Sequence, residues 1–133
     1  MLISLDTNVW ISGFLGDMFC EKIILNLCRL DIIMPNQIRD ELERNLSGDY
    51  MKRFYLLALE ADVRFDFERV PQSYITMFEQ KGLKKGDLII GAFCEWQRVD
   101  IIVSDNRDFL RCLTGEHWFR VLSPQKFCET FDL

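Results

Sequence analysis

The chain has 133 residues, of which 49% are apolar and 28% are charged. This balance is typical of a folded globular chain and excludes disordered and fibrous classes. A chain of this length buries roughly two-thirds of the surface that its unfolded form exposes, so we expect one domain over residues 1–133. The net charge of −5 argues against nonspecific binding to nucleic acid, which depends on an excess of Lys and Arg.

The sequence predicts a cytoplasmic protein with no membrane segment. The start, Met1 to Asp6, has no basic residues, no long apolar core and no cleavage site, so we expect a strand there and not an export signal. No apolar run approaches the ~20 residues needed to cross a bilayer. The single histidine, His117, excludes any mechanism that requires two. The cysteines are odd in number and lack a C-x-x-C pair, so we expect buried free thiols. They are Cys20, Cys28, Cys94, Cys112 and Cys128.

Short apolar runs bounded by turn or charged residues predict strands, and longer stretches with apolar residues three or four apart predict helices. In chain order we expect a strand over 2–5, a helix from 17 or 18 to 30, a strand over 31–34, helices over 35–46 and 50–61, a strand over 63–67, helices over 71–82 and 87–98, a strand over 100–104, a short helix after Asn106, a strand over 119–122 and a helix over 123–131.

Alternating strands and helices predict a parallel sheet, because parallel strands need crossover connections and these are usually helices. The predicted fold class is therefore a three-layer α/β/α sandwich with a central parallel sheet. In open sheets of this kind ligands bind beyond the carboxyl ends of the strands.

Four acidic residues are predicted to meet at that edge. Asp6 ends the first strand and Asp105 follows the fourth. Asp87 begins the helix that leads into the fourth strand, and Glu41 borders the buried stripe of its own helix. Two unit charges ~4 Å apart repel by ~4 kcal/mol at an effective dielectric of ~20, so clustered carboxylates require a counter-charge.

A divalent cation is the predicted counter-charge. Oxygen ligands without a nearby His or Cys favour Mg²⁺ or Mn²⁺ over Zn²⁺. Such an ion would activate water and neutralise charge during hydrolysis of a phosphodiester. Basic residues close to the acids in sequence could form a rim for the substrate and offset the negative net charge. These are Lys81, Lys84, Lys85 and Arg107.

Each acid also has a purely structural explanation. Asp6 could form an Asx-turn, and Asp87 is a suitable helix N-cap. Glu41 could be a solvated helix residue, while Asp105 and Asp108 could cap the short helix that follows them. No single acid is decisive. Their order along the chain and their placement in the predicted fold together favour a shared site.

Four short motifs resemble the PIN-domain family, and together they span nearly the whole chain. They are Leu-Asp-Thr-Asn at Asp6, Ile-x-x-Glu-Leu around Glu41, Gly-Asp-Leu-Ile-Ile-Gly-Ala from Gly86 to Ala92, and Val-Ser-Asp-Asn-Arg-Asp-Phe from Val103. The resemblance implies a metal-dependent ribonuclease with a parallel sheet. Members often serve as the VapC-type toxin of a bacterial toxin–antitoxin pair, which implies RNA as substrate, a small antitoxin as partner and a homodimer.

The resemblance also implies roles for individual residues. The catalytic acids are Asp6, Glu41, Asp87 and Asp105, the metal ligands are Asp6, Asp87, Asp105 and Asp108, and the supporting residues are Asn8, Ser104 and Asn106. Family members commonly read Thr-x-Asp-x-Asp-Phe at the last motif, where this chain has Asn106 in place of an Asp and Asp105 displaced by one position. The fourth ligand is therefore open between Asp105, Asn106 and Asp108, as is the choice of one or two metal ions.

Two alternatives belong to other classes. A phosphotransfer domain also places Asp at strand ends near Mg²⁺. The haloacid-dehalogenase-like phosphatases need an Asp two residues after the first, where this chain has Asn8, and receiver domains need adjacent acids after the first strand. A PIN-like scaffold that binds RNA or protein without cleavage fits the acidic charge and Asn106.

Overall fold

Five parallel strands form one sheet in the computed structural model, which describes residues 1–113 and 116–133. The strand order is β3-β2-β1-β4-β5, and every neighbouring pair is parallel. The predicted α/β/α class is therefore confirmed. The strands are β1 (Leu2–Leu5), β2 (Asp31–Pro35), β3 (Arg64–Asp66), β4 (Ile101–Val103) and β5 (Arg120–Leu122).

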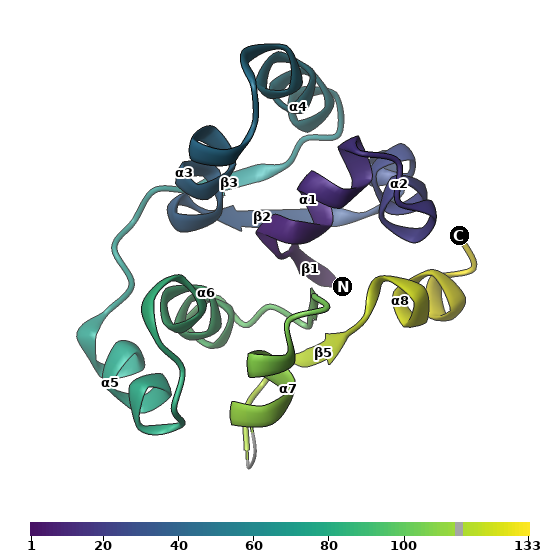
Figure 1. Cartoon of the computed structure of the whole chain (residues 1–133). Coiled ribbons are helices and arrows are strands. Elements are labelled where there is room, and N and C mark those ends of the chain that lie inside the picture. Colours follow the sequence, from purple (N-terminus) through teal and green to yellow (C-terminus); the bar gives the residue numbers. More distant parts are fainter. Residues whose placement is uncertain (114–115) are drawn as a thin grey trace.

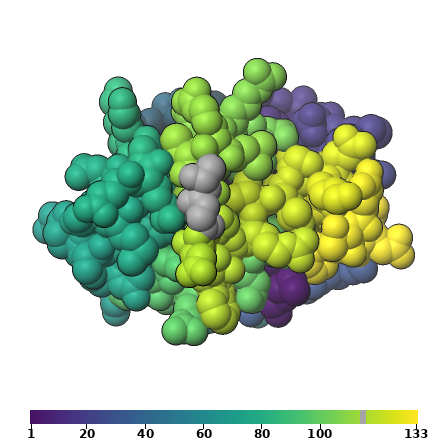
Figure 2. Space-filling view, turned by 90° about the horizontal axis from the view of Figure 1, so that it is seen from below, coloured from purple at the N-terminus to yellow at the C-terminus, as the bar shows by residue number. Residues whose placement is uncertain are grey.

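Helices cover both faces of this sheet (Figure 1). They are α1 (Thr7–Phe14), α2 (Met18–Leu25), a 3-10 turn η1 (Leu27–Arg29), α3 (Asn36–Asn45), α4 (Gly48–Glu60), α5 (Gln72–Gln80), α6 (Lys85–Trp96), α7 (Arg107–Cys112) and α8 (Pro124–Phe131). Helix α1 contacts α2 and α3, and α2 contacts α8, whereas α6 contacts α3, α5 and α7. Seen from below, α5 and the C-terminal helix lie at opposite ends of the molecule (Figure 2).

The central strands are mostly apolar because both of their faces are covered. All three residues of β4 are buried, and so are Ile32, Ile33 and Met34 of β2. Continuous apolar runs of this kind are typical of parallel strands between two helical layers. None of the described helices is both long and apolar enough to cross a membrane.

Helix α1 is the element that the sequence did not predict. Its residues include Thr7, Val9 and Ile11, whose β-branched side chains favour strands as readily as helices. The helix forms because packing selects it: Val9, Trp10 and Phe14 are all buried in the core. Asp6 caps its N-terminus by accepting a hydrogen bond from Thr7 N at 2.8 Å.

Other boundaries also differ from those predicted. Helix α6 begins at Lys85, so Asp87 lies in its first turn and is not the N-cap. The helix expected from residue 17 or 18 to 30 ends at Leu25 and is followed by the separate turn η1. All five cysteines are free, as expected, but only three are buried, and Cys28 is exposed.

Close contact between α1 and α2 depends on Gly13. A Cβ atom at this position would lie 2.1 Å from Ile24 Cδ1 and 3.1 Å from the backbone oxygen of Cys20. We expect Gly13→Ala to lower the free energy of unfolding by about 1–3 kcal/mol, although Ala is the better helix former. Chemical denaturation measures this change. The same substitution at Gly48, where nothing lies within 4 Å of the added Cβ, is the control, and an equal effect of the two variants would contradict the packing role of Gly13.

Candidate active site

Asp6 and Ser104 meet where β1 and β4 end. The two strands pair in register up to Leu5 and Val103, and Asp6 N donates a hydrogen bond to Val103 O at 3.0 Å. The next residue on each strand is thereby placed at the same edge of the sheet. Ser104 Oγ donates to Asp6 Oδ2 at 2.7 Å, and both side chains are buried.

Glu41 reaches the same place from α3. Thr7 Oγ1 donates to Glu41 Oε2 at 2.7 Å, and Gln37 Nε2 donates to Glu41 Oε1 at 3.3 Å. The apolar residues Ile38 and Leu42 bury the inner face of α3, and Glu41 borders that face as predicted. Thr7 therefore orients two of the acids: its backbone N–H donates to Asp6 and its hydroxyl donates to Glu41.

Asp87 lies in the first turn of α6 and is half-buried. Negative charge is favoured near a helix N-terminus, because the first backbone N–H groups have no partner within the helix. Asn106 lies next to Asp87 and caps α7, where its Oδ1 accepts a hydrogen bond from Asp108 N at 2.9 Å. Asn106 N in turn donates to Ser104 Oγ at 2.9 Å, which links this residue to Asp6.

These residues line one cavity of about 260 Å³. Its lining consists of Asp6, Thr7, Asn8, Ile11, Glu41, Asn45, Asp87 and Asn106. The structure therefore brings together three of the four predicted acids, together with the predicted supporting residues Asn8 and Asn106. They come from segments that are up to 100 positions apart in the sequence.

Asp105 does not line this cavity. Its side chain is exposed, and its charge acts on the Cys20 thiol of α2. Asn106, the next residue, lines the cavity, and Ser104 is buried against Asp6, whereas the side chain between them is exposed outside the cavity. Asp108 lies nearer: it lines a neighbouring cavity that shares Glu41 and Asp87 with the first.

That neighbouring cavity carries part of the predicted basic rim. Lys84, Lys85 and Arg111 line it, and Arg111 donates to Asp108 Oδ1 at 2.7 Å. Arg107 is exposed but lines neither cavity. Lys81 points elsewhere, because its Nζ donates to the backbone oxygen of Glu116. Two of the predicted rim lysines thus lie beside the acids, and Arg111 lies there in place of Arg107.

Burial raises the pKa of Asp6 from 3.8 to about 6. Hydrogen bonds from Ser104 and Thr7 lower this pKa, while the charges of Asp87 and Glu41 raise it further. The pKa of Asp87 is also raised, first by burial and then by the charges of Asp108 and Glu41. Three carboxylates thus interact unfavourably when all are ionised, which is the electrostatic condition that a bound cation relieves.

The donor set suits a hard divalent cation. The cavity offers carboxylate, amide and hydroxyl oxygens and contains no His or Cys, which favours Mg²⁺ or Mn²⁺. Among residues 1–113 and 116–133, no three acidic, histidine or cysteine side chains stand close enough together to form a ready coordination set. Asp6 and Glu41 are instead turned toward hydrogen-bond donors of the protein. The residues fit such an ion by the chemistry of their oxygen donors and by their common cavity, and not by a coordination geometry already in place.

Three polar residues of the site were not assigned from the sequence. Thr7 and Gln37 hold Glu41, and Asn45 lines the cavity. Gln37, Glu41 and Asn45 are spaced by four residues, so they lie along one face of α3. That spacing is the signal that could have identified Gln37 and Asn45.

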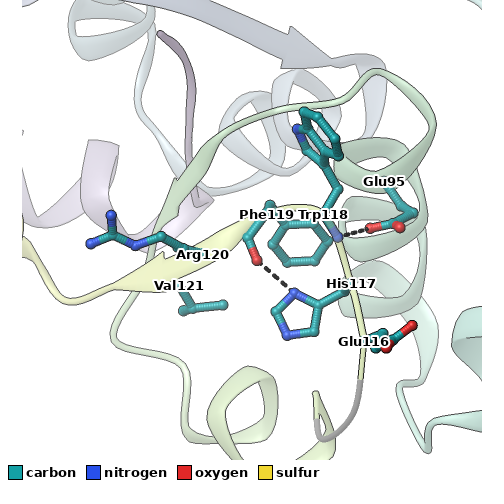
Figure 3. Close-up of a pocket in the computed structure, with 7 residues that line it drawn as sticks. All are labelled: Glu95, Glu116, His117, Trp118, Phe119, Arg120 and Val121. Carbon is teal, nitrogen blue, oxygen red and sulfur yellow. Dashed lines mark hydrogen bonds between the residues drawn. The ribbon is translucent and has the colours of Figure 1, made fainter.

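A wider hollow, of about 870 Å³, lies elsewhere on the molecule (Figure 3). It is formed by residues just before and within β5, at the amino end of the strand and so opposite the acidic cavity. Several of its polar groups are already paired: Trp118 N donates to Glu95 Oε2 at 2.7 Å, and His117 Nδ1 contacts the backbone oxygen of Phe119. The chemistry points to the smaller, acidic cavity.

Fold and site together define a class of α/β proteins that gather carboxylates beyond the carboxyl ends of parallel strands. Within that class, the sequence model described as "PIN domain" matches residues 3–112. The chain therefore belongs to the PIN-domain family. A comparison with curated protein sequences finds no match.

Among solved structures, the chain is similar to one from Rickettsia felis, the crystal structure of VapBC2 bound to a DNA fragment from their promoter. The TM-score is 0.63 with 19% sequence identity, and the match covers 91% of this chain and 98% of the other. At this identity the likeness concerns the fold.

The buried charge of Asp6 gives a test of the electrostatics. Because the pKa of Asp6 is raised from 3.8 to about 6, its ionised form destabilises the folded chain by about 3 kcal/mol above pH 6, and this cost disappears as the pH falls below 3.8. We expect Asp6→Asn to be more stable than the wild type near pH 8 without metal, and the difference to shrink toward pH 4. Urea denaturation in EDTA measures it, and a variant that is less stable at both pH values would contradict the account.

Proposed function

We propose that this chain is a Mg²⁺- or Mn²⁺-dependent endoribonuclease. The observation that supports it most strongly is the meeting of Asp6, Glu41 and Asp87 in one cavity lined by oxygen donors. Membership of the PIN-domain family, whose members are typically nucleases, supports the same reaction class.

Asp6, Glu41 and Asp87 would hold the ion. The raised pKa of Asp6 and of Asp87 supports this assignment, because burial and neighbouring charges disfavour their ionised forms and a cation would offset that cost. When bound, a divalent ion polarises a phosphoryl oxygen and activates water. The protein supplies orientation: Ser104 and Thr7 N hold both oxygens of Asp6, while Thr7 Oγ1 and Gln37 hold those of Glu41. The candidates for the fourth metal ligand are Asn106, which lines the same cavity, and Asp108, which lines the neighbouring one.

RNA is the proposed substrate, with its phosphates held between the acidic cavity and Lys84, Lys85 and Arg111. These three exposed cations line the cavity that adjoins the acids, so they place positive charge where a phosphodiester would enter. A local concentration of this kind accommodates the net charge of −5, since phosphate affinity depends on the cations in contact with the backbone.

We also propose the toxin role of a toxin–antitoxin pair, with a small antitoxin as partner, a homodimer as the assembly and the cytoplasm as location. The support is the fold shared with a VapBC2 structure. Exposed apolar side chains on α4, Leu56 and Leu59, offer surface for a partner protein.

Removal of single acids tests the reaction. We expect the wild type to cleave a labelled RNA panel with Mn²⁺ and to lose cleavage in EDTA. Asp6→Asn and Asp87→Asn should reduce cleavage to background while remaining folded, because each removes a charge that would hold the ion. Gel analysis of the products measures this, with Glu60→Gln on the exposed face of α4 as control. If no RNA is cleaved under any condition, the chain is a PIN-like scaffold.

The fourth acid can be identified by comparing neighbours. Asp108 lines a cavity together with Asp87 and raises its pKa, whereas Asp105 lines neither of the two cavities. We therefore expect Asp108→Asn to raise the Mn²⁺ concentration needed for half-maximal cleavage by about tenfold or more. Asp105→Asn should leave that concentration unchanged. The Mn²⁺ concentration at half-maximal rate measures both. A larger effect of Asp105→Asn than of Asp108→Asn would instead identify Asp105 as the ligand, as the sequence suggested.

A further inference from the structure

Gly86 lies unusually close to the carboxylate of Glu41. A Cβ atom built on Gly86 would be 2.5 Å from Glu41 Oε1 and 3.2 Å from Gln37 Nε2, the donor that holds that oxygen. The Glu41 side chain thus packs directly against the backbone at the start of α6. Any residue larger than glycine would occupy the space that the carboxylate now fills.

The need for glycine here is one of space. The glycines with positive φ among the described residues are Gly16 and Gly82, so the backbone of Gly86 does not require glycine. Ala at this position in a helix would be the better helix former. The atoms that an added methyl group would meet belong to the ends of flexible side chains, so they would move while α6 stayed in place.

We propose that Gly86 is a positioning residue that sets the place of the Glu41 carboxylate relative to Asp6 and Asp87. This inference rests on the function proposed above, because it assigns to Gly86 a role in arranging the same acids. A methyl group at position 86 would push Oε1 away from the start of α6, where Asp87 lies one residue further on. It would also disturb the Gln37 hydrogen bond, leaving Glu41 held by Thr7 alone.

Gly86→Ala tests the proposal, with Gly48→Ala as the matched control, because no atom lies within 4 Å of a Cβ at Gly48. The expected result is an unchanged or higher melting temperature in EDTA for Gly86→Ala, together with a loss of Mn²⁺ affinity of about 10- to 100-fold measured by calorimetry. Gly48→Ala should bind Mn²⁺ like the wild type. A Gly86→Ala protein with wild-type Mn²⁺ affinity would overturn the proposal, and so would one that binds poorly only because it has unfolded.

A double-mutant cycle separates positioning from a general structural effect. Glu41→Gln keeps the size of the side chain and removes its charge, so Gly86→Ala should cause no further loss of Mn²⁺ affinity in that background. A full additional loss would show that Gly86 acts by another route and overturn the proposal. A wild-type chain that neither binds Mn²⁺ nor cleaves RNA would refute the proposed function itself, whereas a wild type active with Mn²⁺ beside an equally active Gly86→Ala would refute only the role of Gly86.

Discussion

Burial of carboxylates close to one another at one edge of the sheet is the constraint on which the rest of the site depends. Pairing of β1 with β4 fixes Asp6 beside Ser104, and the core beneath leaves only 4% of Asp6 exposed. A buried carboxylate next to two other acids is unfavourable in the absence of a cation, and the raised pKa of Asp6 expresses that cost. Hydrogen bonds from Ser104 and Thr7 offset part of it.

The surrounding polar residues therefore act as a frame that keeps the acids close without metal. Thr7 links two of them, since its backbone N–H donates to Asp6 and its hydroxyl donates to Glu41. Ser104 links Asp6 to the backbone of Asn106, which caps α7. The frame connects β1, α3, β4 and α7, so the apolar core that fixes these elements also fixes the site. The buried, adjacent carboxylates lower the stability of the folded chain, as is usual where a site gathers like charges.

Much of this could be predicted from the sequence. The strands β1, β2 and β4 contain short apolar runs. The alternation of strands with helices implies a parallel sheet, in which the ends of β1 and β4 share an edge. Helix α1 could not be predicted, because β-branched residues leave its local preference undecided and burial of Trp10 and Phe14 decides it. The placement of the residues after β4 could not be predicted either, because Asn106 lines the cavity whereas its neighbour Asp105 is exposed outside it. The contact between Gly86 and Glu41 joins two helices that are far apart in the chain, and only the packed structure reveals it.

The most direct measurement is a crystal structure of the chain grown with Mn²⁺, with the ion located by its anomalous scattering. The account predicts a peak inside the cavity lined by Asp6, Glu41 and Asp87, with carboxylate oxygens of at least two of them as ligands. A well-diffracting crystal with Mn²⁺ bound only elsewhere, or with that cavity filled by water alone at saturating Mn²⁺, would contradict it.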